Sequence, residues 1–152
     1  MVYEATSPPL MSVICHCSSC QKAAERIEEK DRAPAVSDAH GGTPLVVFDG
    51  RDTECVQGEE LTEGMRLNDS TITQRIIATC CNSALMLDFD KGPYWVSAFH
   101  DRVEDAPAPE WRVQTKDAAN PEKLPNDVPA YRAWPATFFF RLLRNWPRRK
   151  AP

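Results

Sequence analysis

The chain has 152 residues, of which 42% are hydrophobic and 26% are charged, and its formal net charge is −4. This length suits one domain with a core of its own, and the acidic balance gives no reason to expect a nucleic-acid partner. No apolar run approaches the roughly 20 residues that cross a bilayer. Because the first ten residues lack the basic start and apolar core of a signal peptide, we expect a cytoplasmic protein.

The N-terminal third of the chain predicts an arm, a strand and a helix. Residues 1–10 contain Ser7-Pro8-Pro9 and are expected to form a flexible arm. Residues 11–15 are apolar and predict a strand. Ser18 is a candidate N-cap, with Gln21 completing a capping box, and strong helix formers follow as far as Lys30.

Short segments that are rich in β-branched and apolar residues follow, separated by turn signals. They predict strands at residues 44–48, 53–57, 64–67, 71–79, 84–89 and 94–99. Residues 11–100 are therefore expected to form a mainly β domain, with one short helix after the first cysteines and another helix at the C-terminus.

The last third of the chain changes character. Residues 101–134 are acidic and rich in proline, and we expect an extended arm anchored by Trp111 and Val113. Residues 135–152 predict a basic amphipathic helix and tail, which either packs on the β domain or lies at a membrane interface. We favour packing, because a small β domain needs a covered face. The sequence does not indicate an oligomeric state.

Three of the six cysteines form the motif Cys15-His16-Cys17-Ser18-Ser19-Cys20. In an extended segment Cys15 and Cys17 point to one side and His16 to the other, and a C-x-x-C turn aims two sulfurs at one point. The start of the following helix also favours thiolates. The motif therefore predicts a zinc site. Disulfides, ordinary buried thiols and an iron–sulfur cluster are the alternatives. Disulfide frameworks belong to secreted chains, and the spacing fits neither common ferredoxin pattern.

Three thiolates leave one position of a zinc tetrahedron open. An open position holding water is the catalytic arrangement, whereas a fourth protein ligand makes a structural site. Cys80 and Cys81 are the best-placed candidates for that ligand, because they lie between two predicted strands. Cys55, His16 and His40 are the other candidates.

The segment from Cys15 to Lys22 resembles the CHCxxC(Q/R)(K/R) signature of the glutathione-dependent formaldehyde-activating enzyme family, which includes centromere protein V. Residues 78–85 resemble a degenerate form of that family's later FCxxCGxPL motif. The resemblance covers roughly residues 13–99. It implies a small β-tent fold similar to that of Mss4, a catalytic zinc on Cys15, Cys17 and Cys20, and a carbon–sulfur lyase activity on a thiol–aldehyde adduct.

The chain also departs from that family pattern. No C-x-C pair precedes Cys15, and Ala78 stands where the first cysteine of the later pair would be. The family's second, structural zinc is therefore expected to be absent, with Cys81 or Cys80 redirected to the remaining ion. Two functions stay open at this point: a divergent enzyme that acts on a small thiol or its aldehyde adduct, and a non-catalytic, zinc-stabilised interaction module.

Overall fold

The computed structural model describes residues 1–91 and 94–145, which form nine strands and two α-helices. The prediction of a mainly β domain, with a short helix after the cysteine motif and a helix near the C-terminus, is confirmed. The strands are β1 (Val2–Ala5), β2 (Met11–Cys15), β3 (Thr43–Asp49), β4 (Thr53–Gln57), β5 (Thr62–Met65), β6 (Thr73–Ala78), β7 (Ala84–Phe89), β8 (Trp95–Phe99) and β9 (Trp111–Val113). The helices are α1 (Ser18–Glu28) and α2 (Ala136–Arg144). Short 3₁₀ helices are η1 (Gly50–Asp52), η2 (Glu59–Leu61), η3 (His100–Arg102), η4 (Thr115–Asp117) and η5 (Pro121–Lys123).

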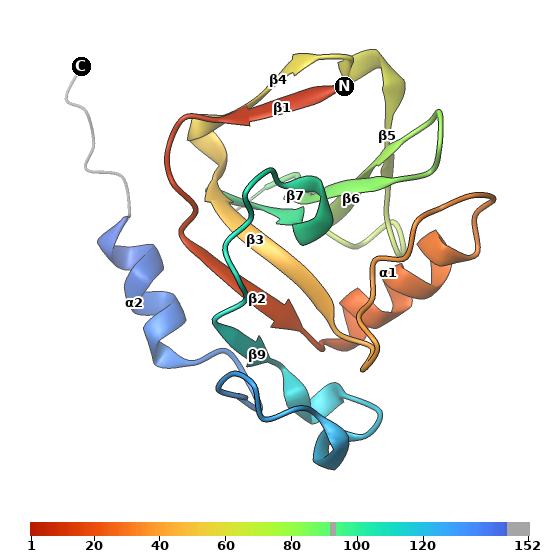
Figure 1. Ribbon diagram of the computed structural model, residues 1–152. Coiled ribbons are helices and arrows are strands. Elements are labelled where there is room, and N and C mark those ends of the chain that lie inside the picture. Colours follow the sequence, from red (N-terminus) through yellow and green to blue (C-terminus); the bar gives the residue numbers. More distant parts are fainter. Residues whose placement is uncertain (92–93, 146–152) are drawn as a thin grey trace.

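Seven of the strands form one sheet in the order β5-β6-β7-β8-β3-β2-β9 (Figure 1). Neighbouring strands are antiparallel except β2 and β9, which run parallel. Strands β1 and β4 form a separate antiparallel pair. Strand β2 therefore lies inside the sheet, and all five of its residues are buried.

The large sheet is covered on both faces, as the alternation along β3 shows. Leu45 and Val47 join a core cluster that also holds Ile27 of α1 and Phe138 of α2. The intervening residues of β3 belong to a second, smaller cluster, against which Tyr3 of β1 packs. The helices thus cover one face of the sheet, and the β1–β4 pair lies over the other.

Two segments differ from the sequence predictions for their regions. Val2–Ala5 forms strand β1, where the sequence predicted a flexible arm, because its backbone pairs with β4 in a register that joins Ala5 to Thr53. The arm predicted at residues 101–134 does wrap the domain, but it contains β9. Trp111 and Val113 are buried there, and the backbone of β9 completes the free edge of β2.

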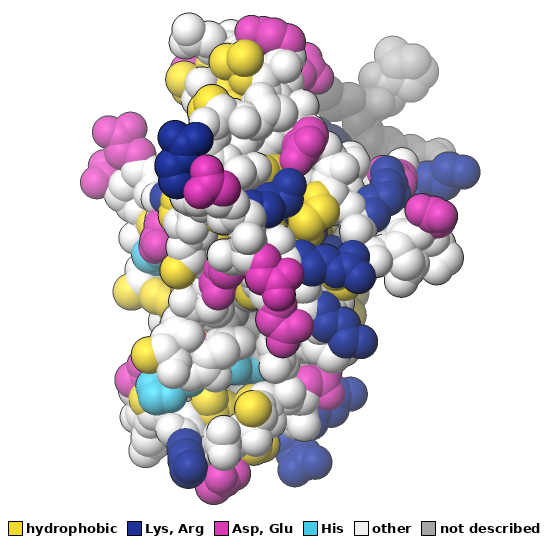
Figure 2. All heavy atoms as spheres, turned by 90° about the vertical axis from the view of Figure 1, so that its right-hand side faces the viewer, with side chains coloured by type: hydrophobic (Ala, Val, Ile, Leu, Met, Phe, Trp, Pro, Cys, Tyr) yellow, Lys and Arg dark blue, Asp and Glu magenta, His cyan; other side chains and the backbone are white. Residues whose placement is uncertain are grey.

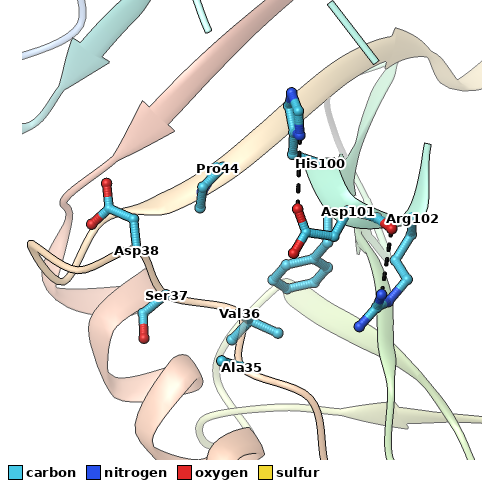
Figure 3. Close-up of a pocket in the computed structure, with 9 residues that line it drawn as sticks. Ala35, Val36, Ser37, Asp38, Pro44, His100, Asp101 and Arg102 are labelled. Atoms are coloured by element: carbon cyan, nitrogen blue, oxygen red, sulfur yellow. Dashed lines mark hydrogen bonds and ion pairs between the residues drawn. The ribbon is translucent and has the colours of Figure 1, made fainter. Parts of the chain in front are cut away.

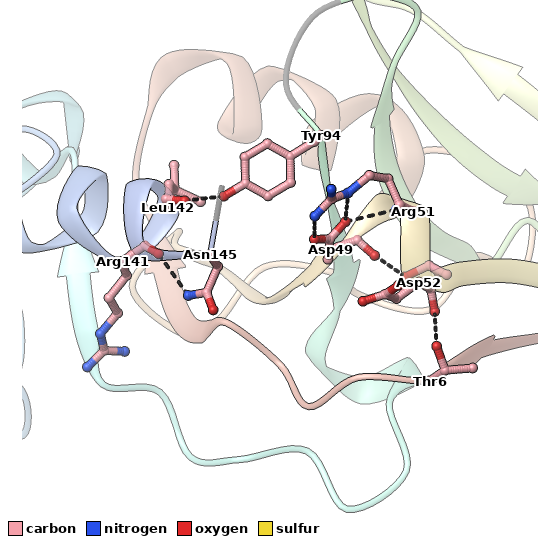
Figure 4. A network of polar contacts seen from close by, with 9 residues as sticks. Thr6, Asp49, Arg51, Asp52, Tyr94, Arg141, Leu142 and Asn145 are labelled. Carbon is pink, nitrogen blue, oxygen red and sulfur yellow. Dashed lines mark hydrogen bonds and ion pairs between the residues drawn. The ribbon is translucent and has the colours of Figure 1, made fainter. Parts of the chain in front are cut away.

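Helix α2 packs on the sheet through Phe138 and Leu142, which are both buried. Figure 4 shows the phenol of Tyr94 donating a hydrogen bond to the carbonyl of Leu142 at this contact. Arg141 pairs with Glu110 and lies 4.7 Å from the ring centroid of Trp111. Packing of the predicted helix on the domain is therefore confirmed for residues 136–144, while residues 146–152 lie outside the described part of the chain.

No helix among the described residues is long and apolar enough to span a membrane. On the face drawn in Figure 2, acidic and basic side chains are interspersed rather than gathered by sign.

Candidate metal centre

The three cysteines of the first motif converge where β2 gives way to α1. Cys15 is the last residue of β2, Cys17 precedes α1, and Cys20 lies in the first turn of the helix. Their sulfur atoms all lie within 4.8 Å of one another. Cys15 and Cys20 are buried, whereas Cys17 is half-buried and gives the group its solvent side. Three sulfurs this close together form a group that could hold a metal ion.

The start of α1 differs in detail from the predicted capping box. Cys17, not Ser18, is the N-cap: its backbone is extended, and its sulfur accepts a hydrogen bond from the N–H of Cys20 at 3.4 Å. Gln21 does not close a box. Its side-chain nitrogen donates instead to the carbonyl of His16 at 2.6 Å and to that of Asp117 at 2.8 Å. The helix N-terminus is therefore aimed at a sulfur atom, which favours the thiolate form.

The surroundings shift the pKa values of the three thiols in different directions. Hydrogen bonds from Cys15 and Cys20, together with backbone N–H groups, hold the pKa of Cys17 well below its ordinary value. The hydrogen bond to Cys17 and burial raise the pKa of Cys15. For Cys20, the hydrogen bond to Cys15 lowers the pKa, but the one to Cys17 and burial outweigh it and raise the pKa to about 12. Of the three thiols, Cys17 is therefore the one that most favours the thiolate form.

A buried arginine lies beside this cluster. Arg75 of β6 is 1% exposed and donates to the carbonyl and hydroxyl of Ser19, at 3.3 Å and 3.1 Å. Its Nη1 atom is buried with no hydrogen-bond partner, and within the described residues it forms no ion pair with a carboxylate. Its charge lowers the pKa of Cys20. Since three thiolates and one divalent ion sum to one negative charge, Arg75 would neutralise a metal-loaded cluster.

Sequence reasoning did not single out Arg75, although a signal was present. In a strand, alternate residues share a face, so Arg75 lies on the same buried face as Ile77. A charged residue at such an inward position needs a partner of opposite charge.

His16 lies outside the sulfur group. Its side chain is fully buried, and neither ring nitrogen has a hydrogen-bond partner in the described structure. The ring packs against Gly42, where an added Cβ would lie 2.7 Å from His16 Cε1. Burial lowers the pKa of His16, which favours the neutral imidazole. His16 is therefore a packed residue behind the cysteines, and His40 is exposed in the loop nearby.

Cys80 and Cys81 are exposed in the loop between β6 and β7, and Cys55 is half-buried in β4. None of them belongs to the sulfur group of Cys15, Cys17 and Cys20. The separation follows from helix α1. Arg75 touches Ser19 at its start, whereas Asn82 donates to the carbonyl of Asp31 beyond its end, at 3.0 Å. Helix α1 rises about 14 Å from Ser19 to its last residue, Glu28, so the structure does not bring the predicted fourth ligand to the site.

Two cavities lie elsewhere on the domain. One, of about 230 Å³, is formed by residues 35–38 and η3, and Figure 3 shows His100 and Asp101 at its wall. The Nδ1 atom of His100 lies 3.8 Å from a carboxylate oxygen of Asp101. The other, of about 480 Å³, lies between β1 and the large sheet. Neither lining includes Cys15, Cys17 or Cys20.

No protein-family model and no curated protein matches this chain significantly. The features that mark this group as a candidate metal centre are the close approach of its three sulfurs and the positive charge of Arg75 beside them.

Proposed function

We propose that this chain binds one zinc ion through the thiolates of Cys15, Cys17 and Cys20. The observation that carries the proposal is the convergence of three sulfurs within 4.8 Å at a strand-to-helix junction. Thiolates in a tetrahedron are the donors that zinc prefers. The helix N-terminus and the positive charge of Arg75, which forms no ion pair with a described carboxylate, both favour the anionic sulfurs that such a site needs.

The fourth zinc position is proposed to be open. Among the described residues, no further His, Cys, Asp or Glu ligand atom joins the three sulfurs. Three protein ligands with one open position is the arrangement of catalytic zinc sites, and a zinc ion there supplies a Lewis acid for a thiol or carbonyl group. Cys17 lies on the solvent side, so a small ligand would approach past it.

Together with the resemblance of residues 15–22 to the formaldehyde-activating enzymes, this openness supports a carbon–sulfur lyase activity on a thiol–aldehyde adduct. For a hydroxymethyl thioether RS–CH₂–OH, the C–S bond breaks and the O–H electron pair forms the C=O bond. The proton moves to sulfur, which gives RSH and formaldehyde. Arg75 would stabilise the extra negative charge of a thiolate that leaves beside the cluster.

The test has two stages. Metal analysis of the purified protein should give one zinc per chain, which Cys17→Ser loses and Cys81→Ser keeps. Cobalt(II) in the same site should then change its absorption spectrum when glutathione is added, and NMR should detect faster cleavage of the glutathione–formaldehyde adduct. A chain without zinc contradicts the site. A chain with zinc whose cobalt spectrum ignores thiols supports the alternative, a zinc-stabilised interaction module.

One observation favours a second function, contact with a membrane surface. On α2, Phe139, Phe140 and Leu143 are 51%, 67% and 66% exposed, opposite the residues that pack on the sheet. No acidic residue follows Asp127, and the last eight residues include Arg148, Arg149 and Lys150. An apolar face with flanking cations is typical of an interfacial helix on anionic lipid.

Co-sedimentation with vesicles of anionic phospholipid tests this second function. The wild type should bind, and Phe140→Asp should abolish binding without changing the fold. Leu61→Asp places the same charge on an exposed apolar residue of η2 and should leave binding intact. Equal binding by the wild type and Phe140→Asp would contradict the proposal.

A further inference from the structure

The loop that joins β6 to β7 holds two adjacent cysteines in a fixed geometry. The N–H of Ala78 donates to the carbonyl of Ser83 at 2.9 Å, and the N–H of Asn82 donates back to the carbonyl of Ala78 at 2.9 Å. Asn82 takes the left-handed conformation, with φ +55°, which asparagine tolerates better than most residues. Its side-chain amide donates a hydrogen bond to the carbonyl of Asp31. The loop of residues 79–83 is thus closed at its base and anchored to a second segment.

The two thiols of this loop lie side by side in solvent. Cys80 and Cys81 are both exposed, and their sulfur atoms are 3.5 Å apart. Two sulfurs bound to one ion at about 2.3 Å with a tetrahedral angle lie about 3.8 Å apart. The pair is therefore spaced to bind a single thiophilic atom with little movement.

Oxidation to a disulfide suits this loop less well. A disulfide draws its sulfurs to about 2.05 Å, and its Cα atoms are usually 4.4–6.8 Å apart. Consecutive Cα atoms are fixed about 3.8 Å apart by a trans peptide, and the described chain has no cis peptide. A bond between Cys80 and Cys81 would thus be strained and easily reduced, which leaves the pair as thiols.

The surroundings make one of the thiols the stronger nucleophile. Ser83 hydrogen-bonds the sulfur of Cys81 at 3.1 Å and lowers its pKa, and the charge of Arg102 acts in the same direction. The hydrogen bond to Cys81 raises the pKa of Cys80. Cys81 can therefore form the first bond to a thiophilic atom. Cys80, which donates a hydrogen bond to the sulfur of Cys81, can then form the second bond to the same atom.

We propose that Cys80 and Cys81 form a second, independent site, which chelates trivalent arsenicals and chemically similar thiophilic ions. With an aryl arsenous oxide, two As–S bonds form and the As=O bond breaks. Both thiol protons leave with the oxygen as water, and arsenic stays trivalent. The length of α1 separates this loop from Cys15, Cys17 and Cys20, so the site does not depend on the proposed zinc.

The test uses phenylarsine oxide as the probe and alkylation of the folded protein as the readout. Zinc-treated protein is mixed with one to three equivalents of the arsenical, alkylated briefly and digested, and the alkylation of each cysteine is measured by mass spectrometry. Cys80 and Cys81 should be protected together and released by 2,3-dimercaptopropanol. Cys55, the half-buried thiol of β4, should react as it does without arsenical.

Single variants separate chelation from ordinary thiol binding. Because the second sulfur binds within one loop, Cys80→Ser should weaken protection of Cys81 roughly 100-fold, and Cys81→Ser should do the same for Cys80. Circular dichroism should show both variants folded, since both side chains are exposed. Full alkylation of the wild-type loop at three equivalents would overturn the proposal. So would undiminished protection in either variant, or a Cys80–Cys81 disulfide in the protein as purified.

Discussion

Two groups of cysteines occupy the two ends of helix α1, and they differ in almost every physical respect. Cys15, Cys17 and Cys20 lie within 4.8 Å of one another in a core, beside a buried arginine. Cys80 and Cys81 lie in solvent on a hairpin loop. Both groups place sulfurs at chelating distance, but only the first is built into the packing of the domain.

The difference shows that a group of thiols contributes to the stability of a fold only when several packed elements meet at it. At the first end of α1, a strand, a helix N-terminus and Arg75 converge on the sulfurs, so an ion there would link elements that already pack together. At the other end a chelated atom closes a ring within one loop and links nothing else. The first site should therefore matter to stability and the second should not.

The largest effect should follow from removing a ligand of the buried cluster. Cys20→Ser should abolish zinc binding, and the stabilisation lost should be about 4 kcal/mol when free zinc is 1,000 times its dissociation constant. Thermal unfolding with and without a chelator measures this loss. The matched variant Cys81→Ser should unfold like the wild type. Equal destabilisation by both variants would remove the contrast between the two groups.

The next effect concerns the charge beside the buried cluster. Arg75→Met keeps the length of the side chain but removes its positive charge, and it should weaken zinc binding by about 10- to 100-fold. Competition with a chromophoric chelator gives the affinity. Arg66→Met, which removes a half-buried arginine paired with Asp90, should leave the affinity unchanged. An Arg75→Met protein with wild-type affinity would show that the guanidinium serves packing alone.

A smaller effect is expected behind the cysteines, where Gly42 packs against His16. A Cβ at residue 42 would lie 2.4 Å from Ile14 Cγ2 and 2.8 Å from His16 Nε2, so Gly42→Ala should cost about 1–3 kcal/mol of stability. It should also weaken zinc binding, because it displaces residues on both sides of Cys15. Gly41→Ala meets no atom within 4 Å. It should reduce stability through its positive φ alone and leave zinc affinity intact, which urea unfolding and metal competition together can show.

The smallest expected effect is a dependence of the free energy of unfolding on pH. Burial raises the pKa of Asp38, but the N–H groups of Gly42 and His40 and the guanidinium of Arg112 outweigh it and hold the pKa below the ordinary 3.8. The Asp38 carboxylate therefore stabilises the fold above pH 3.8, and its contribution disappears as the pH falls through the lowered pKa. Asp38→Asn should cost about 1–2 kcal/mol at pH 7, and this cost should shrink as the pH falls below 3.8. A constant difference in urea unfolding across that range would contradict this assignment.

Much of the β domain could be predicted from local patterns. The bounds of β2, β4 and β7 agree with the predicted ranges, because each is a short apolar or alternating segment between turn residues. Strand β1 has mostly exposed residues and gains its order from pairing with β4. Strand β9 has three residues in a proline-rich acidic segment, and its parallel pairing with β2 joins residues about 100 positions apart. Neither pairing can be predicted from the residues of the strand itself.

The candidate site was predictable to a similar degree. The spacing of Cys15, Cys17 and Cys20 was enough to predict their convergence, because strand alternation and a helix start are local geometry. The position of Cys80 and Cys81 was not, because it depends on how β6 lies along α1. Because Cys80 and Cys81 lie next to a predicted turn, the sequence indicated that one of them could be the fourth ligand. Their distance from the cluster, however, is set by the tertiary packing and has no local signal.

The parallel pairing of β2 with β9 also bears on how the protein is made. Residues 11–15 leave the ribosome about 100 residues before β9, the strand that covers one edge of β2. Until that segment emerges, the nascent β2 has an exposed edge and its neighbouring cysteines lack part of their surroundings. Long-range pairings of this kind also slow folding. The domain that holds this cysteine cluster is thus completed by a strand from the last third of the chain, and a chain truncated before residue 111 would present an open strand beside Cys15, Cys17 and Cys20.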